Sequence, residues 1–347
     1  MFSSVGLTMT TMLQTTHLSK SFSYKQGGLS RMAGKLGLPA KEQQKVHAVS
    51  DVSLTVESGE VLGLVGESGC GKSTVGRMIA GLLPATRGSL SFNGQDITRP
   101  SVETHLGIQM VFQNPYASLN PRQRIDRVIS EAAVYHGLVE KRQAPAFVAS
   151  LLSQVGLDPS YASRYPHQFS GGQRQRIAIA RALALDPKFV VCDEAVSALD
   201  VSVQAQILNL FMDLRESKGL TYLFISHNLA VVEYIADRVA IMYLGRIVEL
   251  ADTRSVFTRP NHPYTQALIA DAPRLNAKVV EHRPIQGELP SPLNPPTGCA
   301  FHPRCPRAMA RCTSERPSLV ELEDGHWSAC HLNDVANSHP LTFQDMQ

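Results

Sequence analysis

The eight residues from Gly66 to Ser73 match the pattern G-x-x-x-x-G-K-[ST] at every position, and Thr74 follows directly. Glycines in such a loop let backbone N–H groups turn toward phosphate oxygens, and a helix that starts there adds partial positive charge. Lys72 supplies a full positive charge for the outer phosphates, and the Ser73 hydroxyl can hold Mg²⁺. We therefore predict a phosphate-binding loop made of Gly66, Glu67, Ser68, Gly69, Cys70, Gly71, Lys72, Ser73 and Thr74.

Two carboxylates, Asp193 and Glu194, follow the apolar run Phe189–Cys192. Ligands of α/β proteins bind where parallel strands end, so this position suits chemistry. Asp193 can hold the Mg²⁺ shell, directly or through water, and Glu194 can orient and deprotonate an attacking water. An isolated Asp-Glu pair more often begins a solvated loop. The apolar run before it and the phosphate loop upstream favour the catalytic interpretation.

Two further polar residues follow apolar runs. Gln113 comes after Ile108–Phe112, and its amide could contact Mg²⁺ or water and sense the γ-phosphate. His227 comes after Tyr222–Ser226 and could hydrogen-bond a phosphate and a general base together. Each residue is a weak signal by itself, since a histidine at such a point is more often an ordinary loop residue.

The segment Ser170-Gly171-Gly172-Gln173 opens a predicted helix. Ser170 suits the N-cap position, which is its purely structural interpretation. The two glycines after it permit very close approach of the backbone to an anion. Because this helix start lies far in sequence from Lys72, it could serve a different nucleotide.

The elements that must position these residues alternate between strands and helices. The runs predicted as strands are 12–24, 46–65, Leu90–Phe92, Ile108–Phe112, Phe189–Cys192 and Tyr222–Ser226. The predicted helices are Val75–Leu83, two within 115–170, Gln173–Ala184 and Val203–Ser217. This alternation predicts an α/β, doubly wound core.

The sequence predicts that the chain has two parts. A core at 1–257 contains a helical subdomain at about 115–170 and a basic insertion at 25–45, which we expect to be a solvated loop. From 258 to 347 the chain is rich in proline and cysteine, so long helices are not expected there.

The composition limits the function classes. The 347 residues are 43% hydrophobic and 18% charged, with a net charge of +3, which neither shows nor excludes a basic nucleic-acid-binding face. No apolar run approaches the ~20 residues of a membrane helix, and the N-terminus has no signal-peptide pattern. We expect the chain to stay in the cytosol and to reach a membrane only through a partner.

The order of these motifs resembles the nucleotide-binding subunit of an ABC transporter over residues 12–257. Such an ATPase, a P-loop NTPase, works as a head-to-tail pair. The resemblance implies that Ser170 and Gly172, with Gly171 and Gln173, contact ATP held by the second ATPase. It also implies that Asp200 lies across the dimer seam and that Phe22 stacks on adenine.

Further segments resemble the ATPases of oligopeptide and dipeptide importers, closest to the dipeptide type, and extend the match to about residue 331. These segments are Gln113–Pro121, Arg164–Phe169, His262–Thr265 and Gly287–Pro292. The resemblance implies ATP hydrolysis with Mg²⁺, at Ser73, Gln113 and Asp193, that energises uptake of di- or oligopeptides. Ala195 and Asn228 depart from the family's proline and aspartate, and neither change removes a catalytic group.

The same resemblance implies the partners and the location. The partners would be a second ATPase, commonly a different chain, two transmembrane permease subunits and a periplasmic or extracellular substrate-binding protein, with no nucleic acid. The chain would lie peripherally on the cytoplasmic face of the inner membrane. Relatives also carry nickel complexes or haem, which leaves those cargoes as an alternative. A soluble ABC ATPase acting on ribosomes or DNA, or an exporter subunit, is disfavoured because there is one phosphate loop, no sustained heptad pattern and no fused membrane domain.

Four of the six cysteines, Cys299, Cys305, Cys312 and Cys330, occupy the last fifth of the chain. Their spacing lacks the C-x2-4-C pair of zinc sites and the runs of ferredoxins, and disulfides suit a cytosolic chain poorly. The spacing alone leaves free thiols and an unspecified thiolate site open. The resemblance to dipeptide-importer ATPases implies a [4Fe–4S] cluster on these four cysteines, in a structural role.

Overall fold

The structure is a computed structural model that describes residues 10–23, 45–99, 101–271, 287–323 and 325–335. The predicted basic insertion at 25–45 lies outside these ranges apart from Lys45. No helix among the described residues has the length and apolarity needed to cross a membrane.

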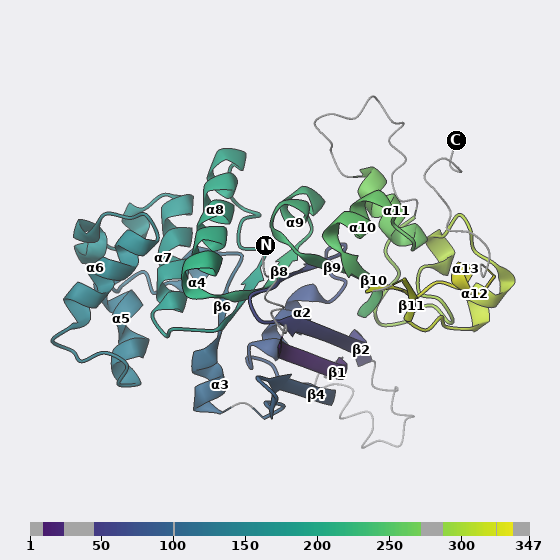
Figure 1. The fold of residues 1–347 in the computed structure, drawn as a ribbon, viewed down its shortest axis with the longest axis horizontal. Coiled ribbons are helices and arrows are strands. Elements are labelled where there is room, and N and C mark those ends of the chain that lie inside the picture. Colours follow the sequence, from purple (N-terminus) through teal and green to yellow (C-terminus); the bar gives the residue numbers. More distant parts are fainter. Residues whose placement is uncertain (1–9, 24–44, 100, 272–286, 324, 336–347) are drawn as a thin grey trace, which may run out of the picture.

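An eight-stranded sheet forms the centre of the molecule in the order β11-β12-β10-β9-β3-β8-β7-β6 (Figure 1). The pairings from β9 through β3, β8 and β7 to β6 are parallel, and those of β9, β10, β12 and β11 are antiparallel. The strands are β3 (Val61–Val65), β6 (Ile108–Val111), β7 (Phe189–Asp193), β8 (Thr221–Ser226), β9 (Arg238–Tyr243), β10 (Arg246–Asp252), β11 (Val320–Glu323) and β12 (His326–Ser328). Every residue of β3, β7 and β8 is buried, which is why these strands are continuous apolar runs.

Alternate residues of the central strands face two different layers. Val190 and Phe224 pack with helices α7 (Gly171–Leu183) and α8 (Val201–Lys218). Val191 and Leu223 pack with α2 (Lys72–Ile79) and with a second sheet. That sheet is antiparallel, in the order β2-β1-β4-β5, and consists of β1 (Thr11–Ser23), β2 (Lys45–Glu57), β4 (Arg87–Phe92) and β5 (Gln95–Asp96). The predicted doubly wound α/β core is confirmed.

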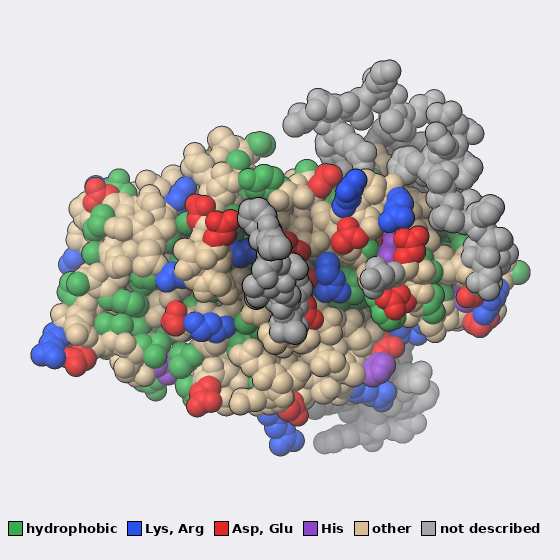
Figure 2. Space-filling model, in the orientation of Figure 1, with side chains coloured by type: hydrophobic (Ala, Val, Ile, Leu, Met, Phe, Trp, Pro, Cys, Tyr) green, Lys and Arg blue, Asp and Glu red, His purple; other side chains and the backbone are tan. Residues whose placement is uncertain are grey.

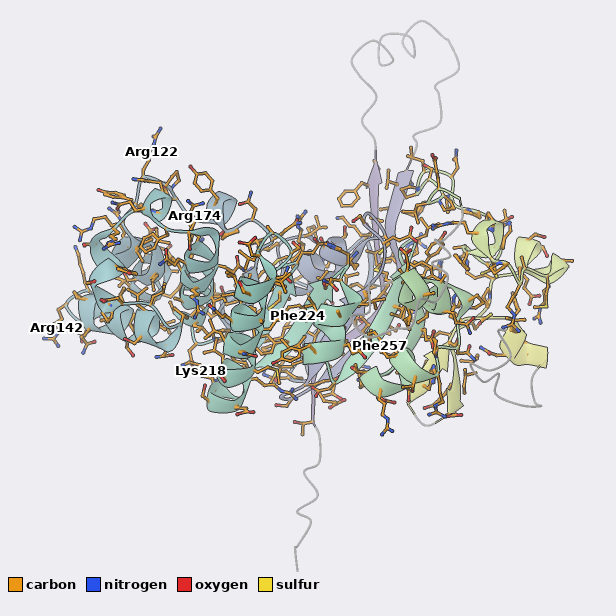
Figure 3. The ribbon with its side chains drawn as sticks, turned by 90° about the horizontal axis from the view of Figure 1, so that it is seen from above. Arg122, Arg142, Arg174, Lys218, Phe224 and Phe257 are labelled. Carbon is orange, nitrogen blue, oxygen red and sulfur yellow. The ribbon has the colours of Figure 1, made fainter. Side chains whose placement is uncertain are left out.

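The predicted helical region lies at one end of the molecule (Figures 1 and 3). It contains α4 (Pro115–Ser118), α5 (Ile125–Tyr135), α6 (Ala144–Gln154), η1 (Pro159–Ser163) and η2 (Pro166–Gln168), which pack on α7. Figure 3 shows Arg142 at its outer end, Arg122 at its upper edge and Phe224 in the central layer. In Figure 2, hydrophobic side chains are abundant over this region, and charges of both signs are mixed across the face.

The C-terminal part lies at the opposite end and continues the central sheet, because β12 pairs with β10. Its helices are α10 (Thr253–Thr258), α11 (Pro263–Asp271), η3 (His302–Arg304), α12 (Ala310–Ser314) and α13 (Leu332–Val335). The remaining helices of the core are α3 (Val102–Gly107) and α9 (Leu229–Ile235). The domain division at residue 257 stays a prediction.

Two predicted element boundaries are wrong. The strand predicted at 46–65 is two strands, β2 and β3, because Gly59 with φ 77° makes a turn between them. The helix predicted at Val75–Leu83 begins earlier, at Lys72, and ends at Ile79, since Gly81 takes φ 70° just beyond.

Candidate functional site

The phosphate-loop pattern occupies the turn between β3 and α2. Gly71 has φ 113°, and a Cβ there would lie 2.2 Å from the Ala48 carbonyl oxygen. A Cβ on Gly66 would lie 2.1 Å from the Met242 carbonyl oxygen. Close backbone approach therefore requires glycine at both positions, and at Gly71 the backbone angle requires it as well.

Lys72 lies inside this loop and is only 4% exposed. Its ammonium donates to the carbonyl oxygens of Gly66 at 2.6 Å and Glu67 at 3.0 Å. A buried positive charge held by its own loop is positioned to meet an anion that enters the same turn.

Ser73 and Asp193 meet although they are 120 positions apart. The Ser73 hydroxyl donates to Asp193 Oδ1 at 2.7 Å. Burial raises the pKa of Asp193, while the hydrogen bond from Ser73 and the charge of Arg77 act in the opposite direction. A hydroxyl beside a carboxylate presents the hard oxygen ligands that Mg²⁺ binds.

Glu194 is the centre of a second cluster. Its Oε2 accepts from the Gln113 amide at 3.0 Å and lies 3.2 Å from His227 Nδ1. The three residues follow β6, β7 and β8, which are neighbours in the sheet, so the strand order brings them together. Glu194 is 14% exposed at its side chain and has φ 49°, a strained angle for a non-glycine residue that also helps aim the carboxylate.

Gln113 contacts Glu194 and, at 3.4 Å, the hydroxyl of Ser197. The Ser197 hydroxyl in turn donates to the carbonyl oxygen of Glu194 at 3.0 Å. The predicted role of Gln113 in holding Mg²⁺ stays a prediction, as do the roles of Asp193, Glu194 and His227.

The segment Ser170–Gln173 begins α7 as a capping box. The Ser170 hydroxyl accepts from Gln173 N at 3.3 Å, and Gln173 Oε1 accepts from Ser170 N at 3.0 Å. The N-cap interpretation of Ser170 is confirmed, and the residue is exposed, so the same surface is open to a second molecule. Gly172 packs closely on α8, where a Cβ would lie 2.5 Å from Val203 Cγ1.

Asp200 and Phe22 are both exposed. Asp200 occupies the N-cap position of α8 without a side-chain capping hydrogen bond, beside Val201, which is 82% exposed. Phe22 lies near the end of β1, with the Lys20 ammonium 5.3 Å from its ring centroid. Asp200 must be exposed to contact a second ATPase at the dimer seam, and Phe22 must be exposed to stack on adenine. Both roles stay predictions.

The two departures from the family pattern have local explanations. Asn228 is the N-cap of α9, and its side chain accepts from Ala230 N at 3.0 Å, a role that aspartate fills equally well. Ala195 is buried beside Glu194 within the core cluster.

The structure adds three residues that sequence reasoning did not place at the site: Ser197, Tyr264 and Arg304. Tyr264 and Arg304 both contact Glu67 of the phosphate loop. Tyr264 belongs to the segment His262–Thr265, so its sequence motif was a usable signal. Nothing in the sequence around Arg304 points to a residue 237 positions away.

The four C-terminal cysteines lie near one another. Burial raises the pKa of Cys330 to about 12, and the charges of Cys299, Cys305 and Cys312 act in the same direction. Cys299 N also donates to the Cys312 carbonyl oxygen at 2.8 Å. Within the described part of the chain, no group of three or more His, Cys, Asp and Glu side chains is arranged as a metal site.

Comparison with known proteins agrees with this geometry. Residues 49–197 match the family described as "ABC transporter", and residues 248–312 match "Oligopeptide/dipeptide transporter, C-terminal region". A probable peptide ABC transporter ATP-binding protein of Sinorhizobium fredii is 53% identical over 84% of each chain. The dipeptide transport ATP-binding protein DppF of Haemophilus influenzae is 50% identical over 85% of this chain and 92% of its own.

A solved structure shares the fold of the core. It is a dimeric, post-hydrolysis state of the ATP-binding cassette MJ0796 bound to ADP and phosphate. The TM-score is 0.59 at 25% identity, covering 70% of this chain and 99% of the other.

Proposed function

The chain belongs to the ATP-binding proteins of peptide ABC transporters, and from this premise we propose that it hydrolyses ATP to drive uptake of di- or oligopeptides. The observation that carries the proposal is the meeting of the phosphate loop with the Ser73–Asp193 and Gln113–Glu194–His227 contacts at the ends of adjacent strands. The peptide transporters among its relatives support a peptide cargo over a nickel complex or haem.

Each residue of the site has its own role in the proposed hydrolysis of ATP. Water attacks the γ-phosphorus, the bond to the β,γ-bridging oxygen breaks, and ADP carries away the electron pair. Glu194 accepts the proton of the water, while Gln113 and His227 hold its carboxylate in place. Lys72 meets the outer phosphate oxygens. Ser73, Gln113 and Asp193 would hold Mg²⁺, which would neutralise charge on the phosphates.

Uptake by the reconstituted complex tests the transport function. We expect ATP-dependent accumulation of labelled di- or oligopeptide in vesicles that contain this chain, its permease subunits and the substrate-binding protein. Competition assays with nickel complexes and haem provide the cargo control. Accumulation of one of these in place of peptide would contradict the peptide assignment while leaving ATP hydrolysis intact.

The second proposal concerns a shared nucleotide pocket. Ser170 and Gly172 would contact ATP held by a second ATPase, which we take to be a different chain, with Asp200 at the seam. The exposure of Ser170 and Asp200 supports this arrangement. The related solved structure is a dimer.

Replacing Ser170 with alanine should leave ATP binding by this chain within about twofold of wild type and lower hydrolysis in the complex by about tenfold or more, because an oxyanion donor is lost. Binding is measured on the full-length chain and hydrolysis on the complex. The matched control is Ser101→Ala, which removes the equivalent N-cap of α3 far from the predicted seam. Equal hydrolysis by the two variants would contradict the shared pocket.

The permease subunits need a surface on the cytoplasmic side. A groove of about 310 Å³ lies between α5, α7 and β6 and is lined partly by apolar side chains. Leu82 on its rim is 55% exposed. An apolar groove beside the helical region suits a helix of a membrane subunit. This groove supports the proposal that the chain lies peripherally on the cytoplasmic face of the inner membrane, where it would hold a permease helix.

We also propose that the four C-terminal cysteines hold a [4Fe–4S] cluster in a structural role. The support is the donor chemistry: thiolates are the ligands of such clusters, and the four cysteines lie in one folded segment, although their side chains are not arranged as a metal site in the described structure. Bound, the cluster would cross-link the segment.

Protein purified without oxygen should contain iron and show a visible absorption band, and Cys312→Ser should lose both. Cys192→Ala is the matched control, since Cys192 lies buried in β7 far from the segment, and it should keep both. Colourless protein that contains zinc and lacks iron would refute the cluster.

A further inference from the structure

The C-terminal part of the chain is tied directly to the phosphate loop. Arg304 Nη1 donates to Glu67 Oε1 and Oε2, both at 3.0 Å. The Arg304 side chain is 6% exposed and that of Glu67 is 24% exposed, so the pair is largely shielded from water. Glu67 is the second residue of the phosphate loop, and its carboxylate has no part in the mechanism above.

A second contact holds the same residue through its backbone. The Tyr264 hydroxyl accepts from Glu67 N at 3.0 Å. This contact directs the Glu67 N–H toward the C-terminal part. Side chain and backbone of one loop residue are thus both held by residues beyond position 257.

Tyr264 is itself held in place by packing and hydrogen bonds. Tyr264 is fully buried, with its ring centroid 4.6 Å from that of Tyr243 and 5.4 Å from that of Phe301. Burial lowers the pKa of His262 to about 4, so the imidazole is neutral and its Nδ1 accepts from Tyr264 N at 3.0 Å. His262 N in turn donates to the buried Glu249 carboxylate at 2.9 Å. The motif His262–Thr265 therefore has a physical task, which is to position the Tyr264 hydroxyl.

We propose that Arg304 and Tyr264 are positioning residues for ATP binding: they fix Glu67 and so hold the phosphate loop in the conformation that receives the triphosphate. Arg304 lies between Cys299 and Cys305 in the chain, so a rearrangement of the cysteine segment reaches the nucleotide through this residue. The inference rests on the proposed ATP binding. The inference adds that the C-terminal part of the chain sets the affinity of the phosphate loop for ATP.

The test is a double-mutant cycle on Mg-ATP binding by the full-length chain. Arg304→Ala and Glu67→Gln should each raise the Kd about tenfold, and the double variant should match the single ones, since residues in contact couple. Arg304→Lys should recover part of the affinity, because one donor already reaches both oxygens. In the complex, the KM for ATP should rise while kcat at saturating ATP changes less than twofold, a split that a general loss of structure would not produce.

Two variants keep the test decisive. Arg259→Ala is the matched control, because the exposed Arg259–Glu323 pair is an Arg–Glu contact within the C-terminal part that does not touch the loop; this variant should keep the wild-type Kd. Tyr264→Phe removes only the hydroxyl and serves where Arg304→Ala lowers stability; it should raise the Kd as well. Wild-type affinity in Arg304→Ala and Tyr264→Phe, or additive effects of Arg304 and Glu67, would overturn the inference. Loss of ATP binding by the wild type itself, at the level of Lys72→Ala, would instead overturn the proposed function.

Discussion

Glu194→Gln is expected to leave ATP binding intact and to lower ATP hydrolysis by at least about 100-fold, because a general base contributes a factor of this order or more. Glutamine keeps the size of the side chain and can still accept through its oxygen from the Gln113 amide. It cannot take a proton from water at neutral pH. The measurements are nucleotide binding by the full-length chain and phosphate release by the complete complex.

The assembly makes one control essential. If the second ATPase is active, its own site continues to release phosphate and hides the loss. The corresponding glutamate of that subunit must therefore be silenced in the same complex. Glu103→Gln makes the same chemical change at an exposed position on α3, and the complex with this variant should hydrolyse ATP at the wild-type rate. Undiminished hydrolysis by Glu194→Gln in a complex with a silenced second site would remove Glu194 from the mechanism.

Lys72→Ala is expected to weaken ATP binding by about 100-fold or more. The ammonium is buried in the loop and would pair with the outer phosphates of bound ATP, and truncating one partner of a buried, hydrogen-bonded charge pair typically costs about 2–5 kcal/mol. With ATP bound, the missing charge also leaves the outer phosphates unmatched. Titration of the full-length chain with Mg-ATP measures the effect directly.

Thermal unfolding must accompany this titration, because Lys72 also bonds to carbonyls of its own loop. Lys188→Ala removes an exposed lysine at the start of β7 and should bind ATP normally. A folded Lys72→Ala protein that binds ATP within threefold of wild type would contradict the phosphate loop as the binding site. Lys72→Ala and Glu194→Gln together separate ATP binding from ATP hydrolysis, because Lys72 acts on binding and Glu194 on hydrolysis.

Much of the site could be predicted from the sequence because its parts are local. Gly66, Gly71, Lys72 and Ser73 stand at fixed spacing within eight residues, although the close contacts that require the two glycines come from Met242 and Ala48 elsewhere in the chain. The buried strands β3, β7 and β8 consist mainly of continuous apolar residues, so these strands could also be predicted from the sequence. The residues at which strands and helices begin and end were harder to predict. A turn at Gly59 and the end of α2 at Ile79 depend on single backbone angles within otherwise apolar stretches.

Other features were decided only by the tertiary structure. The meeting of Gln113, Glu194 and His227 depends on the order in which β6, β7 and β8 pair, and strand order is set by packing of the whole sheet. The contact between Ser73 and Asp193 joins two strand ends 120 positions apart.

Arg304 is the clearest case. Its neighbours in the chain carry no periodic or motif signal, and Glu67 was expected to be only one position of a phosphate loop. The two meet because the C-terminal part adds β12 to the central sheet beside β10 and packs Tyr264 and Phe301 against Tyr243. Residue type and local spacing determined what chemistry this chain can perform. Long-range packing, which has no local period, decided which distant side chains hold the catalytic parts in place.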